Sequence, residues 1–242
     1  MTTTNAPDPS LVATIADRAR SVRQRIAEAA ERAGRDPDDV TLVAVTKTHP
    51  IETVRAAIEA GLLDLGENRV GELVDKSDVI PGASMGGDVR WHLIGSLQRN
   101  KARDAAAIAD LFHGLDSPRL AKALDKKAGD AGRVLPVLVQ VNVSGEDAKH
   151  GVAPEAAHDL VALANEREHL RVVGLMGMAR IAENEDDVER YVRPAFRQLH
   201  DLYRASPVPL SVLSMGMSGD FEVAVEERAT HVRVGSALFG PR

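Results

Sequence analysis

The chain has 242 residues, of which 44% are hydrophobic, so it can bury a sizeable core in one large domain or two small ones. Its 36 acidic and 30 basic residues are interspersed and give a net charge of −6, which excludes an extended nucleic-acid-binding surface. Cysteine is absent, which excludes disulfides, thiolate catalysis and cysteine-ligated metals.

Residues 1–9 have the features of a disordered lead in front of one domain over residues 10–242. This lead is polar, contains two prolines and lacks the charged-then-apolar layout of a signal peptide. No apolar run approaches the length of a membrane span. We therefore expect a cytoplasmic, monomeric protein that engages neither membranes nor nucleic acids.

A regular alternation of strand and helix patterns follows an amino-terminal helix. Ser10 can cap that helix, whose apolar residues recur at helical spacing to about residue 32, before Gly34. Short apolar runs then predict strands at 41–46, 62–65, 90–95, 111–115, 134–143, 171–176, 210–215 and 231–234. Helical patterns follow all but the last of these runs, at 51–60, 68–78, 99–109, 117–129, 154–167, a long segment that ends near 205, and 220–228.

Strands that alternate with helices indicate a parallel sheet, and eight such units in about 240 residues predict a single closed (β/α)₈ barrel of the TIM type. The last helix is short or missing, and the extra amino-terminal helix is expected to cover that gap. The rival α/β architecture is a doubly wound open sheet. Against it, no Gly-x-Gly-x-x-Gly motif follows the first strand.

A lysine ends the first predicted strand. The run Thr41-Leu-Val-Ala-Val-Thr46 leads directly to Lys47, and Pro50 then opens a helical pattern. Burial disfavours a charged amine, so Lys47 would be a nucleophile able to attack an aldehyde. The alternative is a strand-end lysine whose amino group reaches water.

Polar residues and glycines gather at the carboxyl ends of the predicted strands, where barrels of this type carry their functional groups. They are Lys47, Glu67, Asn68, Gly95, Ser96, Gln98, Asp116, Asn142, Ser144, Met176, Gly177, Ser214, Gly216, Ser218, Arg233, Gly235 and Ser236. Turn formation explains part of the glycines and serines. It does not explain a lysine and an arginine that each end a buried strand.

The segments after the last two strands favour an anion. Small residues in 214–220 and 233–236 let backbone N–H groups approach a phosphate, and barrels of this type often bind phosphate there. A phosphate on this side and an amine on the adjacent first strand fit one ligand, a phosphorylated aldehyde. Pyridoxal 5′-phosphate is the leading candidate.

Arg233 would then face the pyridine nitrogen of that ligand. A cation at this place keeps the nitrogen unprotonated and weakens the ring as an electron sink. The alternative for Arg233 is a salt bridge with a neighbouring carboxylate such as Glu222 or Glu226.

The combined motifs resemble those of the pyridoxal phosphate homeostasis proteins, single-domain relatives of the alanine racemase barrel. The motifs are Val45-Thr-Lys47, Gly66-Glu-Asn68, Trp91-His-Leu-Ile-Gly-Ser-Leu-Gln-Arg-Asn-Lys101, Val141-Asn142, Gly174-Leu-Met176, Ser214-Met-Gly-Met-Ser218 and Val232-Arg-Val-Gly-Ser236. The resemblance covers residues 41–240. At Arg69 and Gly71 the chain departs from the commoner family form.

This resemblance implies a cofactor site whose residues can be named. It implies a Schiff base at Lys47, phosphate contacts from Ser218, Gly235 and Ser236, and Arg233 at the pyridine nitrogen. Asn68 and Ser214 complete the expected cofactor-binding set.

The resemblance also implies a role in vitamin B6 homeostasis. A carrier or regulator would bind pyridoxal 5′-phosphate and hand it to apo-enzymes, without robust catalysis. The alternative is a pyridoxal phosphate-dependent amino-acid racemase, which needs an acid/base group on each face of its substrate. Lys47 supplies one, but the two tyrosines, Tyr191 and Tyr203, lie in the long helix after the sixth strand and are expected outside the barrel.

Other candidate groups carry weaker signals. The eight histidines form no His-Glu-x-x-His motif, so no metal site is expected. His92 is either packed in the core or a neighbour of the site. Lys101 and Lys149 are interpreted as surface lysines, although either could receive phosphate or the cofactor transiently.

Overall fold

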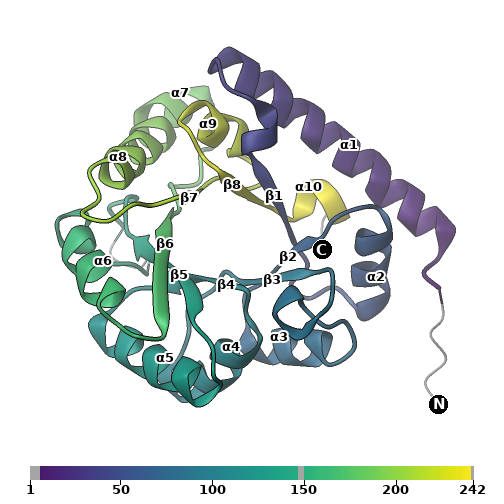
Figure 1. Ribbon diagram of the computed structural model, residues 1–242. Helices are drawn as coiled ribbons and strands as arrows, with labels where there is room; N and C mark the ends of the chain where they lie inside the picture. Colours follow the sequence, from purple (N-terminus) through teal and green to yellow (C-terminus); the bar gives the residue numbers. More distant parts are fainter. Residues whose placement is uncertain (1–5, 147–149, 241–242) are drawn as a thin grey trace.

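Eight parallel strands close into a barrel in chain order, with the last strand paired to the first (Figure 1). The structure is a computed structural model and describes residues 6–146 and 150–240. The strands are β1 (Thr41–Val45), β2 (Asp64–Glu67), β3 (Arg90–Leu93), β4 (Leu111–Leu115), β5 (Leu135–Val141), β6 (Leu170–Gly177), β7 (Val212–Ser214) and β8 (His231–Val234). The expected (β/α)₈ barrel is confirmed.

Helices surround the barrel on its outside (Figure 1). They are α1 (Pro9–Arg32), α2 (Ile51–Glu59), α3 (Val70–Ser77), α4 (Ala102–Ile108), α5 (Pro118–Asp130), α6 (Ala157–Asn165), α7 (Glu185–Asp187), α8 (Arg193–Arg204), α9 (Phe221–Glu226) and α10 (Ser236–Phe239). Most of the apolar core lies between the strands and the helices that bury an apolar stripe against them.

The extra helix α1 packs against α2, α9 and α10 (Figure 1). It covers the part of the barrel that the last helix, α10, leaves open because it has only four residues. Its buried residues recur at helical spacing and are Ile15, Ala19, Val22, Ile26, Ala29 and Ala30. The cap differs from the expected Ser10. The Asp8 carboxylate accepts a hydrogen bond from the Ser10 backbone N–H, and the helix begins at Pro9, whose fixed φ suits a first turn.

Strand boundaries lie within two residues of those expected, and those of 111–115 and 231–234 agree fully. The expected strand at 62–65 is displaced to β2. Gly61 has a left-handed φ of 80°, and the Leu62 N–H donates back to Ala57 O at 3.0 Å, so the end of α2 occupies these residues.

The long helix expected to end near residue 205 is divided. A π-helical turn, Val188–Val192, separates α7 from α8. Pro194 stands in the first turn of α8, where its missing N–H removes one donor from the helical ladder. The single long helix expected from the sequence is therefore two helices, α7 and α8, joined by a π-helical turn.

The interior of the barrel is more polar than the aliphatic strand patterns suggested. The buried polar residues on its strands include His92, His113, Gln140, Ser214 and Arg233. His113 Nδ1 lies 3.0 Å from Ser214 Oγ, although β4 and β7 are not neighbours, so this contact crosses the interior. In the described part of the chain, none of the helices is long and apolar enough to cross a membrane.

If α1 is an integral part of the single domain, removing its core contacts should destabilise the whole barrel. Ile15 is 1% exposed, so Ile15→Ala should lower the free energy of unfolding by about 2–5 kcal/mol. Ile181 is 86% exposed, so Ile181→Ala should change it by less than about 0.5 kcal/mol. Urea unfolding followed by circular dichroism measures both, and a second transition confined to α1 in the Ile15→Ala protein would contradict the single-domain assignment.

Candidate functional site

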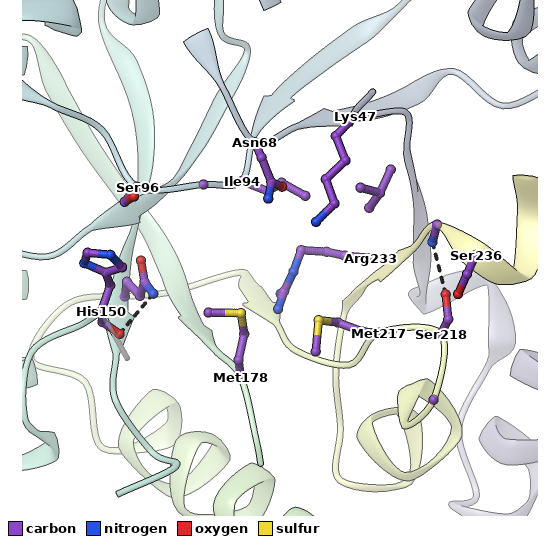
Figure 2. Close-up of a pocket in the computed structure, with 15 residues that line it drawn as sticks. Lys47, Asn68, Ile94, Ser96, His150, Met178, Met217, Ser218, Arg233 and Ser236 are labelled. Atoms are coloured by element: carbon purple, nitrogen blue, oxygen red, sulfur yellow. Dashed lines mark hydrogen bonds between the residues drawn. The ribbon is translucent and has the colours of Figure 1, made fainter. Parts of the chain in front are cut away.

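A cavity of about 490 Å³ lies at the carboxyl end of the barrel strands. Its lining comes from β1, β5 and β8 and from the segments that follow β1, β2, β3, β5, β6, β7 and β8 (Figure 2). The lining residues are Val45, Lys47, Asn68, Ile94, Gly95, Ser96, Gln140, His150, Met178, Met217, Ser218, Gly219, Arg233, Gly235 and Ser236. The volume is within the range of small-molecule sites, roughly 300–1,000 Å³.

Six of the seven residues expected to bind a cofactor line this cavity. They are Lys47, Asn68, Ser218, Arg233, Gly235 and Ser236. The seventh, Ser214, is fully buried and contacts Arg233 from the interior of the barrel. The strand-end argument therefore found the cavity, while Ser214 lies behind one of its lining residues.

Lys47 is the second residue after β1, and its amino group points into the cavity on the side of Arg233 (Figure 2). The next residue, Thr48, has a left-handed φ of 66°, which is uncommon for a β-branched residue. Its backbone N–H donates to Glu72 Oε2 at 2.7 Å. This contact holds the strained turn, which costs about 1–3 kcal/mol, in place next to the lysine.

A buried ionic cluster lies beside the end of β1. Lys76 Nζ donates to Glu67 Oε1 at 2.7 Å and to the Thr46 carbonyl at 2.8 Å, and Thr46 Oγ1 donates to the same carboxylate oxygen at 2.6 Å. Glu67 Oε2 has no hydrogen-bond partner among the described residues. Burial raises the pKa of Glu67, while the bonds from Lys76 and Thr46 oppose that rise. The cluster fixes the residue immediately before Lys47.

Arg233 is buried beside the cavity. Its Nη1 donates to Ser214 Oγ at 2.6 Å and its Nη2 donates to the Gly177 carbonyl at 3.1 Å. Burial lowers the pKa of Arg233 to about 10. The guanidinium is therefore still a cation at neutral pH, with its orientation fixed by two acceptors on β7 and β6.

The alternative role for Arg233, an ion pair with Glu222 or Glu226, is wrong. Those carboxylates pair with arginines of α1, Glu222 with Arg25 at 2.8 Å and Glu226 with Arg32 at 2.8 Å. Their contacts attach α9 to α1 on the outside of the barrel. The positive charge of Arg233 consequently stays on the side of the cavity.

The loops after β7 and β8 meet through one hydroxyl. Ser218 Oγ accepts hydrogen bonds from the backbone N–H groups of Gly235 at 3.2 Å and Ala237 at 3.3 Å. Ser236 lies beside them, on the same side of the cavity (Figure 2). The hydroxyls of Ser218 and Ser236 thus lie on one side of the cavity, beside backbone N–H groups that donate to Ser218.

Gly216 is needed for the course of the loop after β7. Its φ is +90°, and a Cβ at this position would lie 2.6 Å from the Ala224 Cβ and 2.9 Å from the Phe221 Cα. Any side chain would therefore force α9 away from the strand. The close approach brings Ser218 to the loop after β8.

Several lining residues were not predicted. Ile94, Gln140, His150, Met178 and Met217 contribute walls and polar groups to the cavity. Gln140 stands inside an apolar strand run, and its Nε2 donates to the His150 carbonyl at 3.1 Å. A single glutamine in such a run was an available signal. His150 belongs to an irregular loop, where no periodic pattern could have placed it.

Other expected candidates lie elsewhere. Asn142 and Ser144 do not line the cavity; Ser144 Oγ donates to Asn142 Oδ1 at 2.9 Å and organises the loop after β5. Lys101 is exposed on a 3-10 turn, as expected of a surface lysine. Lys149 is outside the described residues.

Two further residues, His92 and Arg69, do not line the cavity either. His92 is buried inside the barrel, where it contacts His113 and Asp64. Arg69 is exposed at the amino-terminal cap of α3.

The two tyrosines have structural contacts outside the cavity. Tyr203 Oη donates to the Leu210 carbonyl at 2.9 Å. The ring of Tyr191 lies against the guanidinium groups of Arg180 and Arg190. Both belong to the segment between β6 and β7, and neither lines the cavity.

Comparison with known sequences gives a consistent picture. The family described as "Alanine racemase, N-terminal domain" matches residues 18–242. A pyridoxal phosphate homeostasis protein of Aquifex aeolicus is 42% identical over 227 residues, which cover 93% of this chain and 97% of the relative. The protein of the same name in Pseudomonas aeruginosa is 40% identical and covers 96% and 97% of the two chains.

Solved structures agree with this picture. PipY of Synechococcus elongatus, described with PLP bound, superposes with a TM-score of 0.76 at 33% identity, covering 93% of this chain and 100% of its own. A protein of Bifidobacterium adolescentis described as unknown gives 0.86 at 34% identity, with 96% and 97% coverage. Alanine racemase of Clostridium difficile gives 0.73 at 15% identity, covering 93% of this chain and 57% of the racemase, and shares the fold.

The buried cluster of Glu67, Lys76 and Thr46 should contribute measurably to stability. Lys76→Met leaves the Glu67 carboxylate buried without its cation, so the free energy of unfolding at neutral pH should fall by about 3–5 kcal/mol. The matched control is Lys127→Met, which removes an exposed pair with Asp130 and should leave stability nearly unchanged.

The loss should depend on pH with a defined sign. A carboxyl whose pKa is raised by folding holds its proton more tightly in the native state, so stability falls as pH rises above the unfolded pKa of Glu67, about 4.3. The defect of Lys76→Met should therefore shrink as pH is lowered toward 4.5. A defect of equal size at both pH values in urea titrations would show that the ion pair is not its cause.

Proposed function

Because the chain belongs to the pyridoxal phosphate homeostasis protein family, we propose that it holds pyridoxal 5′-phosphate as a Schiff base on Lys47 and acts in vitamin B6 homeostasis as a carrier or regulator. The observation that carries this proposal is one cavity that joins a lysine amine, a buried guanidinium and two hydroxyls. The PLP-bound PipY structure supports the choice of ligand.

The donor set of the cavity fits this cofactor. Lys47 supplies the amine that an aldehyde requires, and Arg233 supplies a buried cation with its orientation fixed. Ser218, Gly235 and Ser236 supply hydroxyl and backbone donors suited to a phosphate. The aldehyde, the pyridine nitrogen and the phosphate of the cofactor thus each match one set of protein groups.

Each set has a defined task in the proposed complex. Ser218, Gly235 and Ser236 bind the phosphate, Lys47 bonds the aldehyde carbon, and Arg233 donates toward the pyridine nitrogen. Asn68 lines the wall between β2 and the lysine. When bound, the cofactor supplies an electrophilic carbon and a ring that can accept electrons from a substrate carbon.

The lining favours holding the cofactor over turning over a substrate. Arg233 places a cation where ring protonation would otherwise make a strong electron sink. A racemase needs two acid/base groups, and of the lining residues His150 is the one that could accompany Lys47. His150 is exposed, so it lacks the fixed, water-excluded setting that preorganised catalysis needs.

The attachment site can be tested by reduction. Loaded protein should be yellow, and borohydride should fix the cofactor to Lys47, because the amine of this lysine points into the cavity. Peptide mapping by mass spectrometry should place the label on the peptide that contains Lys47. A label found mainly on another lysine, such as Lys101, would refute the assignment.

The carrier and racemase readings differ in alanine chemistry. Intact loaded protein should racemise alanine no faster than free pyridoxal 5′-phosphate mixed with the Lys47→Ala protein, and it should activate an added apo-enzyme by releasing cofactor. Chiral chromatography after long incubation measures the first result, and recovered enzyme activity measures the second. Alanine racemisation by the native protein that disappears in both Lys47→Ala and His150→Gln would favour the racemase function over the carrier function.

A further inference from the structure

An unbroken row of hydrogen-bonded polar groups runs through the barrel interior from Arg233 to Asp64. Arg233 Nη1 lies 2.6 Å from Ser214 Oγ, which lies 3.0 Å from His113 Nδ1. His113 Nε2 lies 3.0 Å from His92 Nδ1, and His92 Nε2 lies 3.0 Å from Asp64 Oδ1. The row takes one residue from each of β8, β7, β4, β3 and β2.

When both imidazoles are neutral, the carboxylate end of this row sets the direction of every bond within it. A guanidinium can only donate and a carboxylate can only accept. Ser214 therefore accepts from Arg233 and donates to His113, His113 donates through Nε2 to His92, and His92 donates through Nε2 to Asp64. In this arrangement each imidazole carries its single proton on Nε2.

The surroundings favour the same state. His113 is fully buried, and its pKa is lowered well below the ordinary value, first by burial and then by His92, Arg233 and His231. Burial raises the pKa of Asp64, but the bonds from His92 and Arg90 outweigh burial and lower it. The row thus has a cation at one end, an anion at the other and a neutral His113 beside Ser214.

We propose that Asp64, His92, His113 and Ser214 are positioning residues for Arg233. Asp64 sets the direction of the row at the amino end of the barrel, and this direction makes Ser214 Oγ an acceptor whose own proton is engaged by His113. The lone pairs of Ser214 therefore stay available to Arg233. Together with the Gly177 carbonyl, they hold the guanidinium in one orientation at the cavity.

The consequence for the ligand rests on the proposed function. A guanidinium held in one orientation presents the same donors to the pyridine nitrogen in every molecule. If the row were reversed, Ser214 would accept from both His113 and Arg233, and the bond to Arg233 would weaken. Asp64, at the far end of the row, would then influence the electronic state of the bound cofactor without touching it.

Two-bond ¹H–¹⁵N correlation spectra of the protein without added cofactor test the direction of the row, because they distinguish the two neutral tautomers of histidine from the imidazolium. At neutral pH, His92 and His113 should both be the Nε2–H tautomer. Either residue found as the Nδ1–H tautomer or as an imidazolium would overturn the proposal. This result is independent of whether pyridoxal 5′-phosphate binds.

The role of Asp64 is tested by Asp64→Asn, whose amide can donate as well as accept. This variant permits the reversed row, so the spectra should show Nδ1–H tautomers at His92 and His113, and guanidinium protons of Arg233 should exchange faster with water. The matched control is Arg90→Gln, which removes the ion pair of Asp64 with Arg90 but leaves the row intact. Its tautomers should be those of the native protein.

Spectra of Asp64→Asn that match those of Arg90→Gln would overturn the positioning role. If Asp64→Asn fails to fold, Ser214→Ala breaks the row at its other end and should speed exchange at Arg233 while His92 keeps its Nε2–H tautomer. Unchanged exchange at Arg233 in that variant would also overturn the proposal. In loaded protein, Asp64→Asn should shift the absorbance maximum of the cofactor and Arg90→Gln should not.

Discussion

Closure of the barrel between its first and last strands is the constraint on which the site depends. β1 pairs with β8 in the register Thr41↔His231, Leu42↔Val232, Val43↔Arg233 and Ala44↔Val234. This register brings Lys47, from the first fifth of the chain, to the same cavity as the loops that end it. A slip by one residue would turn the side chains of β8 to the opposite face and would take Arg233 out of the interior.

Two buried polar systems support the two basic side chains of the cavity, Lys47 and Arg233. Glu67 and Lys76 fix the residue before Lys47, and the row from Asp64 fixes Arg233. Buried ionic groups of this kind cost desolvation energy that aliphatic residues would avoid. The core between the strands and the helices is almost wholly apolar, so these buried ionic groups are an exception. We interpret their role as orienting Lys47 and Arg233 at the cavity.

The sequence predicted most of the fold, because strands buried on both faces leave continuous apolar runs and the surrounding helices leave a period of 3.6 residues. The expectation that Lys47 and Arg233 lie at one place agrees with their positions in the lining of one cavity, because the carboxyl ends of barrel strands meet there. The partnership of Glu67 with Lys76, the crossing contact of His113 and the place of His150 could not be predicted. They depend on which side chains face each other across a closed sheet and on the course of an irregular loop, and local patterns contain neither.

Equilibrium binding of three ligands to the native protein tests most directly whether one cavity joins the lysine to a phosphate site. Pyridoxal 5′-phosphate has both groups, pyridoxal lacks the phosphate, and pyridoxamine 5′-phosphate lacks the aldehyde. Pyridoxal 5′-phosphate should bind most tightly. Loss of the phosphate should weaken binding at least about tenfold, because each charge-assisted bond contributes about 1.5–3 kcal/mol. Pyridoxamine 5′-phosphate should bind more weakly because it cannot bond to Lys47. Equal affinity for pyridoxal and its phosphate would contradict the account.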